Sequence, residues 1–447
     1  MESGSEQQLG AKSIPKLIIQ QSVPAAFGIL FMTVNMLIDT VFMGRWIGPL
    51  AIAALSVVMP AVFFIGSVGF AIGVGGSSVI SRALGDDKKE KAFSAFAHQI
   101  LFTAMLTLSL AAAGLVFSEQ ILNFLGAKGK IFEPAKIFYF PILIAAPLQA
   151  FLGMGTSVMR TENKARFSMA TIIISGISNL LLDFIFIKLL GWGIFGAALA
   201  TALSFLTAFL FMLWFFIFKS GFKLKSKHFI PDWKLSQEIT ALSFSTFSRQ
   251  GVITVLSILL NSVLFRHGGE NAVTVYGIAS RMLMFALFPV NGITEGFLPV
   301  AGYNFGAKKF DRVRQSITVS VKYAALLAVL IYAAILIFAE PIVALFTQDK
   351  NVLAQAPNAL RWIFAASPVI ALQLIGAAYF QAAGNAKKSL LLTLSKQGFF
   401  LIPLILILPH FFGIFGVWVA FPIADVLATA LTAFFLKREM NIQLNKQ

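Results

Sequence analysis

Long apolar runs alternate with short polar or glycine-containing breaks along almost the whole chain. A helix needs about 20 mostly apolar residues to cross a bilayer. Lipid offers no partner to backbone N–H and C=O groups, so each long run is predicted to be a transmembrane helix. We expect twelve spans, at residues 18–42, 50–80, 93–116, 137–158, 167–188, 193–217, 240–264, 272–301, 317–338, 357–382, 389–408 and 413–436.

The composition agrees with this pattern. Hydrophobic residues make up 58% of the 447 residues and charged residues 12%, whereas ordinary soluble domains have roughly 25% charged residues. A soluble protein of this size could not bury so much apolar surface, which excludes most soluble enzymes. A porin-type barrel would show short alternating segments instead. The predicted fold class is therefore all-α and integral to the membrane.

The net charge of +16 is mainly an excess of basic residues on alternate loops. If the N-terminus lies in the cytoplasm, 24 of the 35 Lys and Arg residues fall on the inner side, 8 on the outer side and 3 within spans. Basic residues favour the cytoplasmic side of a membrane. We therefore expect a multi-pass protein of the inner (plasma) membrane with both termini cytoplasmic, no cleaved signal peptide and no nucleic-acid partner.

The two halves of the sequence resemble each other at an offset of about 221 residues. Residues 81–85 correspond to 302–306, with a Lys pair after each, and the motif Gly-Ile-Phe-Gly at 193–196 returns at 413–416. An even number of spans per half gives both halves the same orientation, an arrangement found in secondary transporters with a substrate site near the midplane. We predict two pseudo-symmetric six-helix lobes, at 1–218 and 239–447, joined by a basic linker at 219–238.

Ionisable residues inside a span are costly and therefore mark candidate functional sites. Asp39 lies in the first predicted span, and Asn179 and Asp183 lie in the fifth, four residues apart and so on one helix face. Thr201 lies in the sixth span. The repeat fold does not require this polar cluster, because the corresponding positions of the second half are apolar, among them Leu260, Phe399 and Phe421.

Three interpretations of the cluster are open. Two carboxylates, an amide and a hydroxyl form a hard-oxygen site that suits a small monovalent cation. Alternatively, the two carboxyl groups share a proton, since two nearby carboxylates in a low dielectric do not both ionise easily. The simplest structural interpretation is hydrogen bonding between helices, with Asp183 near the outer mouth. We favour a role in ion coupling.

The second half carries its own polar residues within spans, including Asp425. Arg281 and Glu295 are fourteen residues apart in one predicted span, close to four helical turns, so they share a face and either line a water-filled cavity or pair with other helices. Met and Phe side chains offer an adaptable apolar lining, although the same residues are common at lipid-facing and packing positions. The candidate substrate contacts are Asn35, Met59, Phe63, Gln250, Arg281, Met284 and Glu295.

Pro24 lies early in the first span. It removes one backbone donor and frees the carbonyl of Gln20, so it can kink the helix that carries Asp39. A helix that bends easily and carries an ionisable residue is a plausible switch, and the alternative is a static bend.

The stretch that begins at Asn179 and Asp183 and continues through Gly191-Trp192-Gly193-Ile194-Phe195-Gly196 to Thr201 resembles the multidrug and toxic compound extrusion (MATE) family. Asp39, the loop at 160–166 and the turn at 299–306 agree with this resemblance, which covers essentially the whole chain. It implies two six-helix lobes arranged as a V around a central cavity. It also implies export of organic cations and other amphipathic compounds by alternating access, driven by inward flow of H⁺ or Na⁺.

The resemblance implies residue roles as well. The family's first-lobe cation site corresponds to Asp39, Asn179, Asp183 and Thr201, which would be metal ligands if the ion is Na⁺, and its bending first helix corresponds to Pro24. Gln250 stands where one branch has an acidic residue, and no acid falls within 357–382, which favours the DinF-like or archaeal-like branch.

These expectations define the partners. We expect a transporter and not an enzyme, monomeric in the lipid bilayer, with small amphipathic or cationic substrates and no cofactor apart from the coupling ion. The chain has no Cys and its four His are scattered, so neither a thiolate nor a His-rich metal site is predicted.

Two other functions fit parts of the sequence. A lipid-linked oligosaccharide or lipid flippase of the wider superfamily would line its cavity with more cationic residues. A membrane-embedded transferase would need a second acidic cluster opposite Asp86 and Asp87, which the sequence lacks. There is also no phosphate-binding loop to support an ATP-driven pump.

Overall fold

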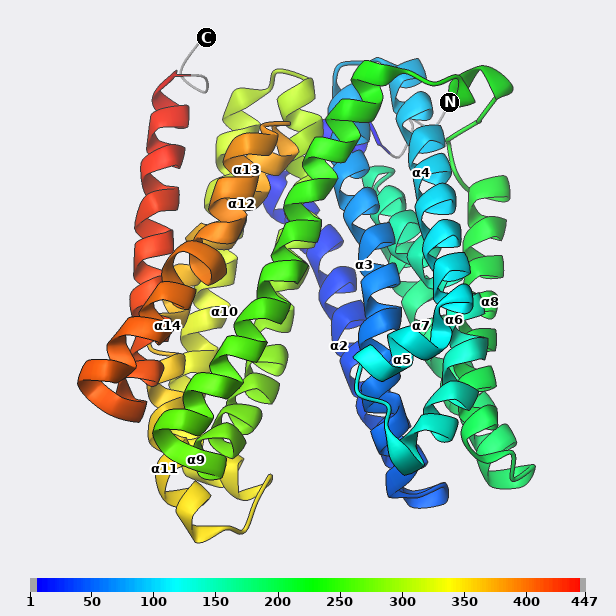
Figure 1. The fold of residues 1–447 in the computed structure, drawn as a ribbon. Helices are drawn as coiled ribbons and strands as arrows, with labels where there is room; N and C mark the ends of the chain where they lie inside the picture. Colours follow the sequence, from blue (N-terminus) through cyan, green and yellow to red (C-terminus); the bar gives the residue numbers. More distant parts are fainter. Residues whose placement is uncertain (1–5, 443–447) are drawn as a thin grey trace. The chain divides into compact units, whose positions relative to one another are not determined.

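The computed structural model describes residues 6–442, and these are almost entirely helical, with no strand among them (Figure 1). The first repeat contains α2 (Ile14–Trp46), α3 (Pro49–Gly85), α4 (Lys89–Val116), α5 (Ser118–Phe124), α6 (Phe132–Thr161), α7 (Ala165–Asp183) and α8 (Gly193–Phe218). The second contains α9 (Trp233–Gly306), α10 (Phe310–Ala344), α11 (Lys350–Ile363), α12 (Ser367–Ala382), α13 (Ala386–Leu394) and α14 (Ile402–Ile442). Shorter elements are α1 (Gln8–Ala11), the 3₁₀ turns η1 (Gly129–Ile131) and η3 (Ser226–Phe229), and the π-helical turns η2 (Phe184–Leu189) and η4 (Ser395–Leu401).

The helices account for the twelve predicted spans once two of them are divided. Nine helical stretches of the described chain are long and apolar enough to cross a membrane, or ten if the bent pair α11 and α12 is one span. A straight helix with the 74 residues of α9 would be about 110 Å long at 1.5 Å per residue, far more than one crossing needs. However, α9 breaks at Gly269 and α14 breaks at Gly413, where φ is 63° and 56°, and division at these glycines gives twelve spans.

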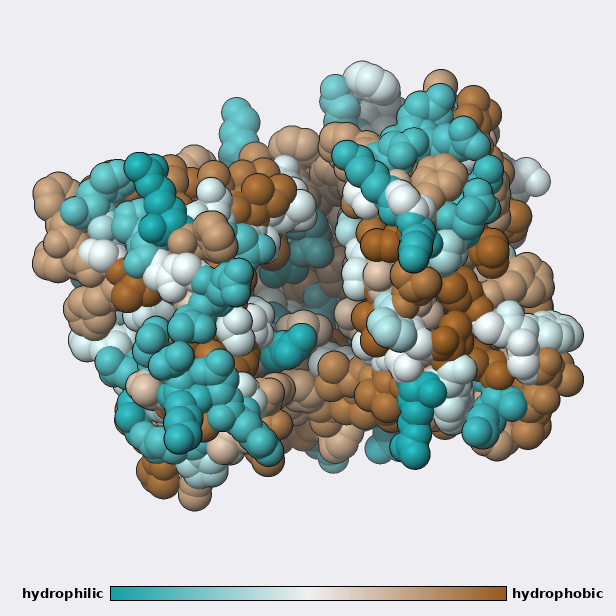
Figure 2. All heavy atoms as spheres, turned by 60° about the horizontal axis from the view of Figure 1, so that its bottom comes forward, coloured by the Kyte–Doolittle hydropathy of each residue, from teal (hydrophilic) through white to brown (hydrophobic). Residues whose placement is uncertain are grey.

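Large apolar side chains are exposed along the flanks of these helices. Phe124 is 90% exposed and Leu345 is 85% exposed, and brown apolar spheres lie open along the outer edges of the view in Figure 2. Soluble proteins rarely leave such extensive apolar surface in water. The structure therefore supports the predicted membrane-embedded, all-α fold class.

The described chain forms two compact units. Of the described residues, the first unit contains 6–8 and 27–243, and the second contains 9–26 and 244–442. The predicted domain bounds, 1–218, 219–238 and 239–447, stay a prediction. The compact units differ from them in two segments, because residues 9–26 belong to the second unit and residues 219–243 to the first.

In the first unit, α3 and α6 approach each other closely along a row of glycines. A Cβ on Gly69 would stand 2.2 Å from the Ala150 carbonyl oxygen, and one on Gly73 would stand 2.7 Å from the Met154 Cα. Small residues four apart let membrane helices come into backbone contact. This contact holds α3 beside the core around Phe138 and Ile142, against which the candidate site is built.

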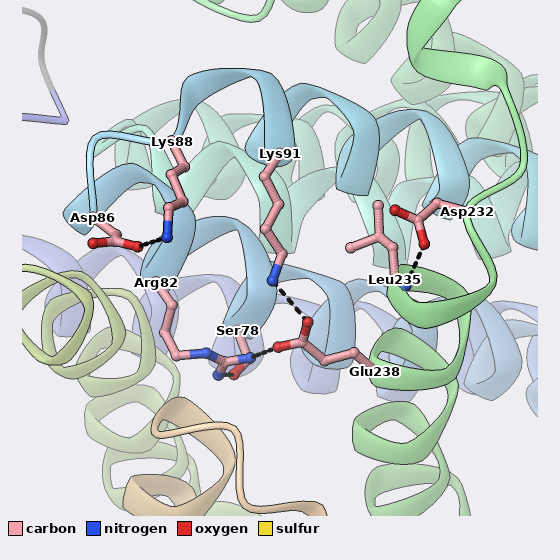
Figure 3. Close-up of polar contacts among 8 residues, drawn as sticks. All are labelled: Ser78, Arg82, Asp86, Lys88, Lys91, Asp232, Leu235 and Glu238. Atoms are coloured by element: carbon pink, nitrogen blue, oxygen red, sulfur yellow. Dashed lines mark hydrogen bonds and ion pairs between the residues drawn. The ribbon is translucent and has the colours of Figure 1, made fainter.

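The first turns of α9 are fixed to the first unit by charged side chains (Figure 3). The Glu238 carboxylate accepts hydrogen bonds from Arg82 on α3 at 2.7 Å and from Lys91 on α4 at 2.9 Å. The Asp232 side chain accepts from the Leu235 N–H at 3.0 Å and so caps the start of α9. The leading segment of the second repeat is therefore part of the first unit.

The leading segment of the first repeat is held in the second unit in a similar way. The Asn304 side chain donates to the Leu9 carbonyl at 3.0 Å, and Arg312 donates to the Lys12 carbonyl at 2.7 Å. Leu17 and Ile18 on α2 are fully buried in the core of the second unit. Each repeat thus contributes its leading segment to the other unit.

Candidate ion-binding site

Three helices of the first unit bring the predicted coupling residues together. Asp39 lies on α2, Asn179 and Asp183 lie near the end of α7, and Thr201 lies on α8. All four side chains are buried, with exposed fractions from 0% at Asp183 to 9% at Thr201. The structure therefore places these four residues in one interior cluster.

The Asn179 amide connects the three helices. Its carbonyl oxygen accepts a hydrogen bond from the Asn35 side chain at 3.0 Å, and its NH₂ group donates to the Thr201 hydroxyl at 3.4 Å. The Thr201 hydroxyl in turn donates to the Ala197 carbonyl at 3.1 Å. These contacts fix the orientation of the Asn179 side chain, and they tie α2 and α8 to α7 beside the two carboxyl groups.

The carboxyl groups of Asp39 and Asp183 lie next to each other and interact directly. Neither Asp183 oxygen, nor Oδ1 of Asp39 or of Asn35, has a hydrogen-bond donor of normal geometry among the described residues. Buried polar atoms without partners are costly, and two adjacent carboxylates repel each other in a low dielectric. The site is therefore a cluster of oxygen acceptors that a proton or a small cation would stabilise.

The backbone at Asp183 changes from an α-helix to the π-helical turn η2. A π-helical turn widens a helix and is frequent at functional sites. Ile187 within the turn is buried in the same core as Met43. The ammonium group of Lys188, within this turn, lies over the Trp46 ring at 5.9 Å from the ring centre, and no ion pair joins Lys188 to Asp39 or Asp183 among the described residues.

Pro24 is buried in the part of α2 that belongs to the second unit. It precedes Asp39 by fifteen residues, about 22 Å along a helix, so it does not touch the ion-binding candidates. It stands close to the point, between Ala26 and Phe27, where α2 passes from one unit to the other. The predicted bending of α2 at Pro24 stays a prediction.

The predicted substrate contacts of the first unit have different surroundings. Asn35 belongs to the polar cluster through its hydrogen bond to Asn179. Met59 on α3 is partly buried against the core of the first unit, and Phe63 one turn along is exposed. Their roles in binding substrate stay predictions.

In the second unit, Gln250, Arg281 and Met284 are exposed on α9. Glu295 is half-buried, and it lies close enough to the half-buried Arg249 to act on the charge of its guanidinium group. The helical spacing predicts that Arg281 shares a face with Glu295, but it cannot predict the approach of Arg249. Arg249 lies in the preceding span and approaches Glu295 because the chain turns at Gly269.

A further charged pair of the second unit was not predicted. The Lys396 ammonium nitrogen lies 2.7 Å from Asp425 Oδ1, with both side chains largely buried. The available signal was the presence of one basic and one acidic residue in the last two predicted spans. Neither span alone indicates that the two side chains face each other.

Comparison with known proteins agrees with this architecture. The MatE family model matches residues 24–185 and 249–407. A multidrug export protein MepA from Staphylococcus haemolyticus is 26% identical over 425 residues, which cover 95% of this chain and 93% of the relative. An FAD transporter from Shewanella oneidensis is 25% identical over 419 residues, with 93% and 92% covered.

Solved structures show the same fold. A crystal structure of a MATE protein in complex with MaD3S has a TM-score of 0.93 and 26% identity, and all of both chains is covered. An outward-facing multidrug resistance MATE family transporter gives the same TM-score, identity and coverage. The family match covers most of this chain on both repeats, so the chain belongs to the MATE family of multidrug efflux transporters, which are multi-pass membrane proteins and not enzymes.

Proposed function

We propose that this protein is an antiporter that exports organic cations and other amphipathic compounds in exchange for H⁺ or Na⁺. Asp39 and Asp183 bind the ion, and the Asn179 amide and the Thr201 hydroxyl supply neutral oxygen and nitrogen atoms beside them. The observation that carries this proposal is the buried pair of carboxyl groups, in which both Asp183 oxygens and Oδ1 of Asp39 lack hydrogen-bond donors among the described residues. Such a pair is stable only when a cation or a proton accompanies it.

Ion binding changes the balance of forces between α2 and α7. Without an ion, the negative charges of Asp39 and Asp183 push the two helices apart, opposed by the Asn35–Asn179 hydrogen bond. With an ion, the repulsion becomes attraction and the outer part of α2 moves toward α7. Pro24 lies where α2 enters the other unit, so bending there would let the outer part of α2 move while its first turns stay in place.

The driving force depends on the charge of the substrate. One elementary charge that enters across a potential of 100 mV releases about 2.3 kcal/mol. Since about 1.4 kcal/mol corresponds to a tenfold concentration ratio, one entering cation can support a gradient of about fiftyfold for an uncharged substrate. Export of a monovalent cation in exchange for one ion moves no net charge, so it is driven by the concentration gradient of the coupling ion.

Membrane orientation and substrate class are part of the proposal. The distribution of Lys and Arg favours an inner-membrane protein with both termini in the cytoplasm. Its relatives include multidrug exporters and an FAD transporter. For this chain we favour amphipathic cations, because the cluster in the first unit is acidic, and we propose that a monomer carries out transport.

Efflux from proteoliposomes tests the proposal. Ethidium transport is measured under a pH gradient and, separately, under a Na⁺ gradient. We expect Asp39→Asn and Asp183→Asn to abolish gradient-driven transport, whereas Glu270→Gln, at an exposed carboxylate on α9, leaves it unchanged. Wild-type-like, gradient-dependent transport by both aspartate variants would refute the assignment of the ion site.

A further inference from the structure

The second unit contains a buried ion pair that the transport mechanism above does not use. Lys396 Nζ lies 2.7 Å from Asp425 Oδ1, and the two side chains are only 13% and 4% exposed. Lys396 is the second residue of η4, and Asp425 lies in the part of α14 that follows the break at Gly413. Both residues lie inside predicted spans, where an unpaired charge is strongly unfavourable.

The pair links the same two helices of the repeat as the ion-binding cluster of the first unit. An offset of 220 residues relates the two motifs Gly193–Gly196 and Gly413–Gly416. With this offset, Lys396 corresponds to Gly176, three residues before Asn179 on α7. Asp425 corresponds to residue 205, four residues after Thr201 on α8. Both repeats therefore place a buried polar link between their fifth and sixth helices, within about one turn of the equivalent position.

The two links differ in what balances the carboxyl charge. In the first unit, no basic side chain among the described residues forms an ion pair with Asp39 or Asp183, and buried oxygens of both lack hydrogen-bond donors. In the second unit, Asp425 Oδ1 also lacks a hydrogen bond of normal geometry, but the Lys396 ammonium nitrogen lies 2.7 Å from it as an ion pair. When an ammonium group contacts a buried carboxylate, the two charges neutralise each other, so binding of a further cation would stabilise the carboxylate little.

The backbone near the two links has a feature in common. Each repeat has a π-helical turn on its fifth helix, η2 after Asp183 and η4 around Lys396. A π-helical turn redirects side chains relative to the rest of the helix. In the first repeat, the π-helical turn follows Asp183, a carboxylate without a basic partner among the described residues. In the second repeat, the π-helical turn contains Lys396, which carries the ammonium group.

We propose that Lys396 is a tethered cation, which occupies in the second unit the role that an exchangeable ion has in the first. Asp425 is therefore permanently neutralised, and the second unit contributes no ion to the transport cycle. The number of ions exchanged per substrate is set by the Asp39–Asp183 cluster alone. This inference rests on the proposed function, because it assigns the ion stoichiometry of the antiport proposed above.

Removal of the ammonium group is the direct test. Lys396→Met leaves the Asp425 carboxylate buried without its partner, so this variant should acquire a second exchangeable ion. The expected result is one additional H⁺ or Na⁺ bound per purified protein, and an increase of one in the ion-to-substrate ratio measured from reversal potentials in proteoliposomes. Lys396→Arg keeps the positive charge and should retain the wild-type values.

The double variant Lys396→Met with Asp425→Asn removes both charges and should return the ion count to that of the wild type. If Lys396→Met alone does not fold, the double variant still tests the proposal. Its two buried side chains are neutral, so no uncompensated charge destabilises the fold. The proposal is overturned if the double variant binds or transports fewer ions than the wild type, since Asp425 would then take part in coupling. It is also overturned if folded Lys396→Met gains no ion.

Failure of this inference can be distinguished from failure of the proposed function. Ion binding to purified protein is counted by proton release or by Na⁺ titration, and it requires no transport. If Asp39→Asn and Asp183→Asn leave transport intact, the assignment of the first-unit site is wrong whatever the Lys396 variants show. If those variants abolish coupling while the double variant also loses ions, only the tethered-cation proposal is wrong.

Discussion

Ser243 of α9 lies so close to Gly75 of α3 that a Cβ on Gly75 would stand 2.4 Å from the Ser243 Oγ. The same relationship recurs in the second unit, where a Cβ on Gly296 would stand 2.5 Å from the Ser22 Oγ. Gly75 and Gly296 are 221 positions apart, and so are Ser22 and Ser243, which is the offset of the sequence repeat. The reciprocal exchange of leading segments is therefore built on equivalent glycine–serine contacts.

Gly75→Ala and Gly296→Ala should both destabilise the protein. In each case the new methyl group would also overlap backbone atoms, at 2.5 Å from Ser243 N and 2.6 Å from Ser22 N, so the leading segment must shift. Overpacking of this kind costs about 1–3 kcal/mol. The thermal midpoint of detergent-purified protein measures the effect.

Gly277→Ala is the matched control, because Gly277 lies on α9 and a Cβ there meets no atom within 4 Å. This change should leave the thermal midpoint unchanged or raise it, since Ala is favoured over Gly within a helix by up to about 1 kcal/mol. Equal destabilisation at all three glycines would contradict the proposed close contacts.

The hydrogen bond from Asn35 to Asn179 predicts energetic coupling between α2 and α7. Asn35→Ala and Asn179→Ala should each weaken ion binding, because the polar atoms beside the carboxyl cluster lose their fixed orientation. A double-mutant cycle on the ion dissociation constant should give a coupling energy of about 1 kcal/mol. Thr207→Ala, at an exposed hydroxyl on α8, should show no coupling with either change, and strictly additive effects of the two asparagine variants would exclude the proposed link.

The sequence was sufficient to predict the helical membrane fold and to indicate which polar residues gather in the interior of the first unit. Apolar runs of bilayer length leave helices as the solution for the backbone, and the i, i+4 spacing already placed Asn179 and Asp183 on one face. Asp39 and Thr201 could be added because polar residues within apolar spans are rare, and the family resemblance supported the same four positions.

Other features depend on contacts that no local pattern contains. The exchange of leading segments requires that residues 9–26 and 219–243 pack on the other repeat's helices, whereas their composition only indicates a membrane helix start and a basic linker. Arg249 approaches Glu295 because α9 reverses at Gly269. Lys396 and Asp425 face each other across helices, a relationship that depends on helix rotation and on the π-helical turn.

Arg312→Ala should release the leading segment of the first repeat. The Arg312 guanidinium donates to the Asn304 side-chain oxygen at 2.8 Å and to the Leu9 and Lys12 carbonyls at 3.2 and 2.7 Å. Loss of hydrogen bonds from a charged group costs about 1.5–3 kcal/mol, which should accelerate amide hydrogen exchange in residues 9–14 by at least tenfold.

Arg314→Ala is the control for this experiment, because it removes a half-buried arginine from the same helix α10 and leaves the three contacts of Arg312 in place. Its exchange rates in residues 9–14 should match those of the wild type. Similar acceleration in both variants would show that net charge, and not the contacts of Arg312, retains the segment.

A buried carboxyl group outside the spans makes stability depend on pH. Glu162, between α6 and α7, is only 4% exposed. The Ser220 hydroxyl donates to its Oε1 atom, and the Gly221 N–H donates to its Oε2 atom at 3.0 Å. Burial raises the pKa of Glu162 from 4.5 to about 7, the charge of Glu6 raises the pKa further, and the two donors and Lys164 oppose the shift.

The folded protein should therefore lose stability as the pH rises from about 4.5 to 7. Across this range folded Glu162 holds a proton that the unfolded chain has released, and a shift of this size corresponds to about 3 kcal/mol. Glu162→Gln cannot ionise and should remove this pH dependence from the thermal midpoint. Ser220→Ala removes a donor to the carboxylate and so raises the pKa of Glu162, which should extend the loss of stability to higher pH. Glu133→Gln, at an exposed residue of α6, should keep the wild-type profile. An unchanged pH profile in Glu162→Gln would assign the dependence to another group.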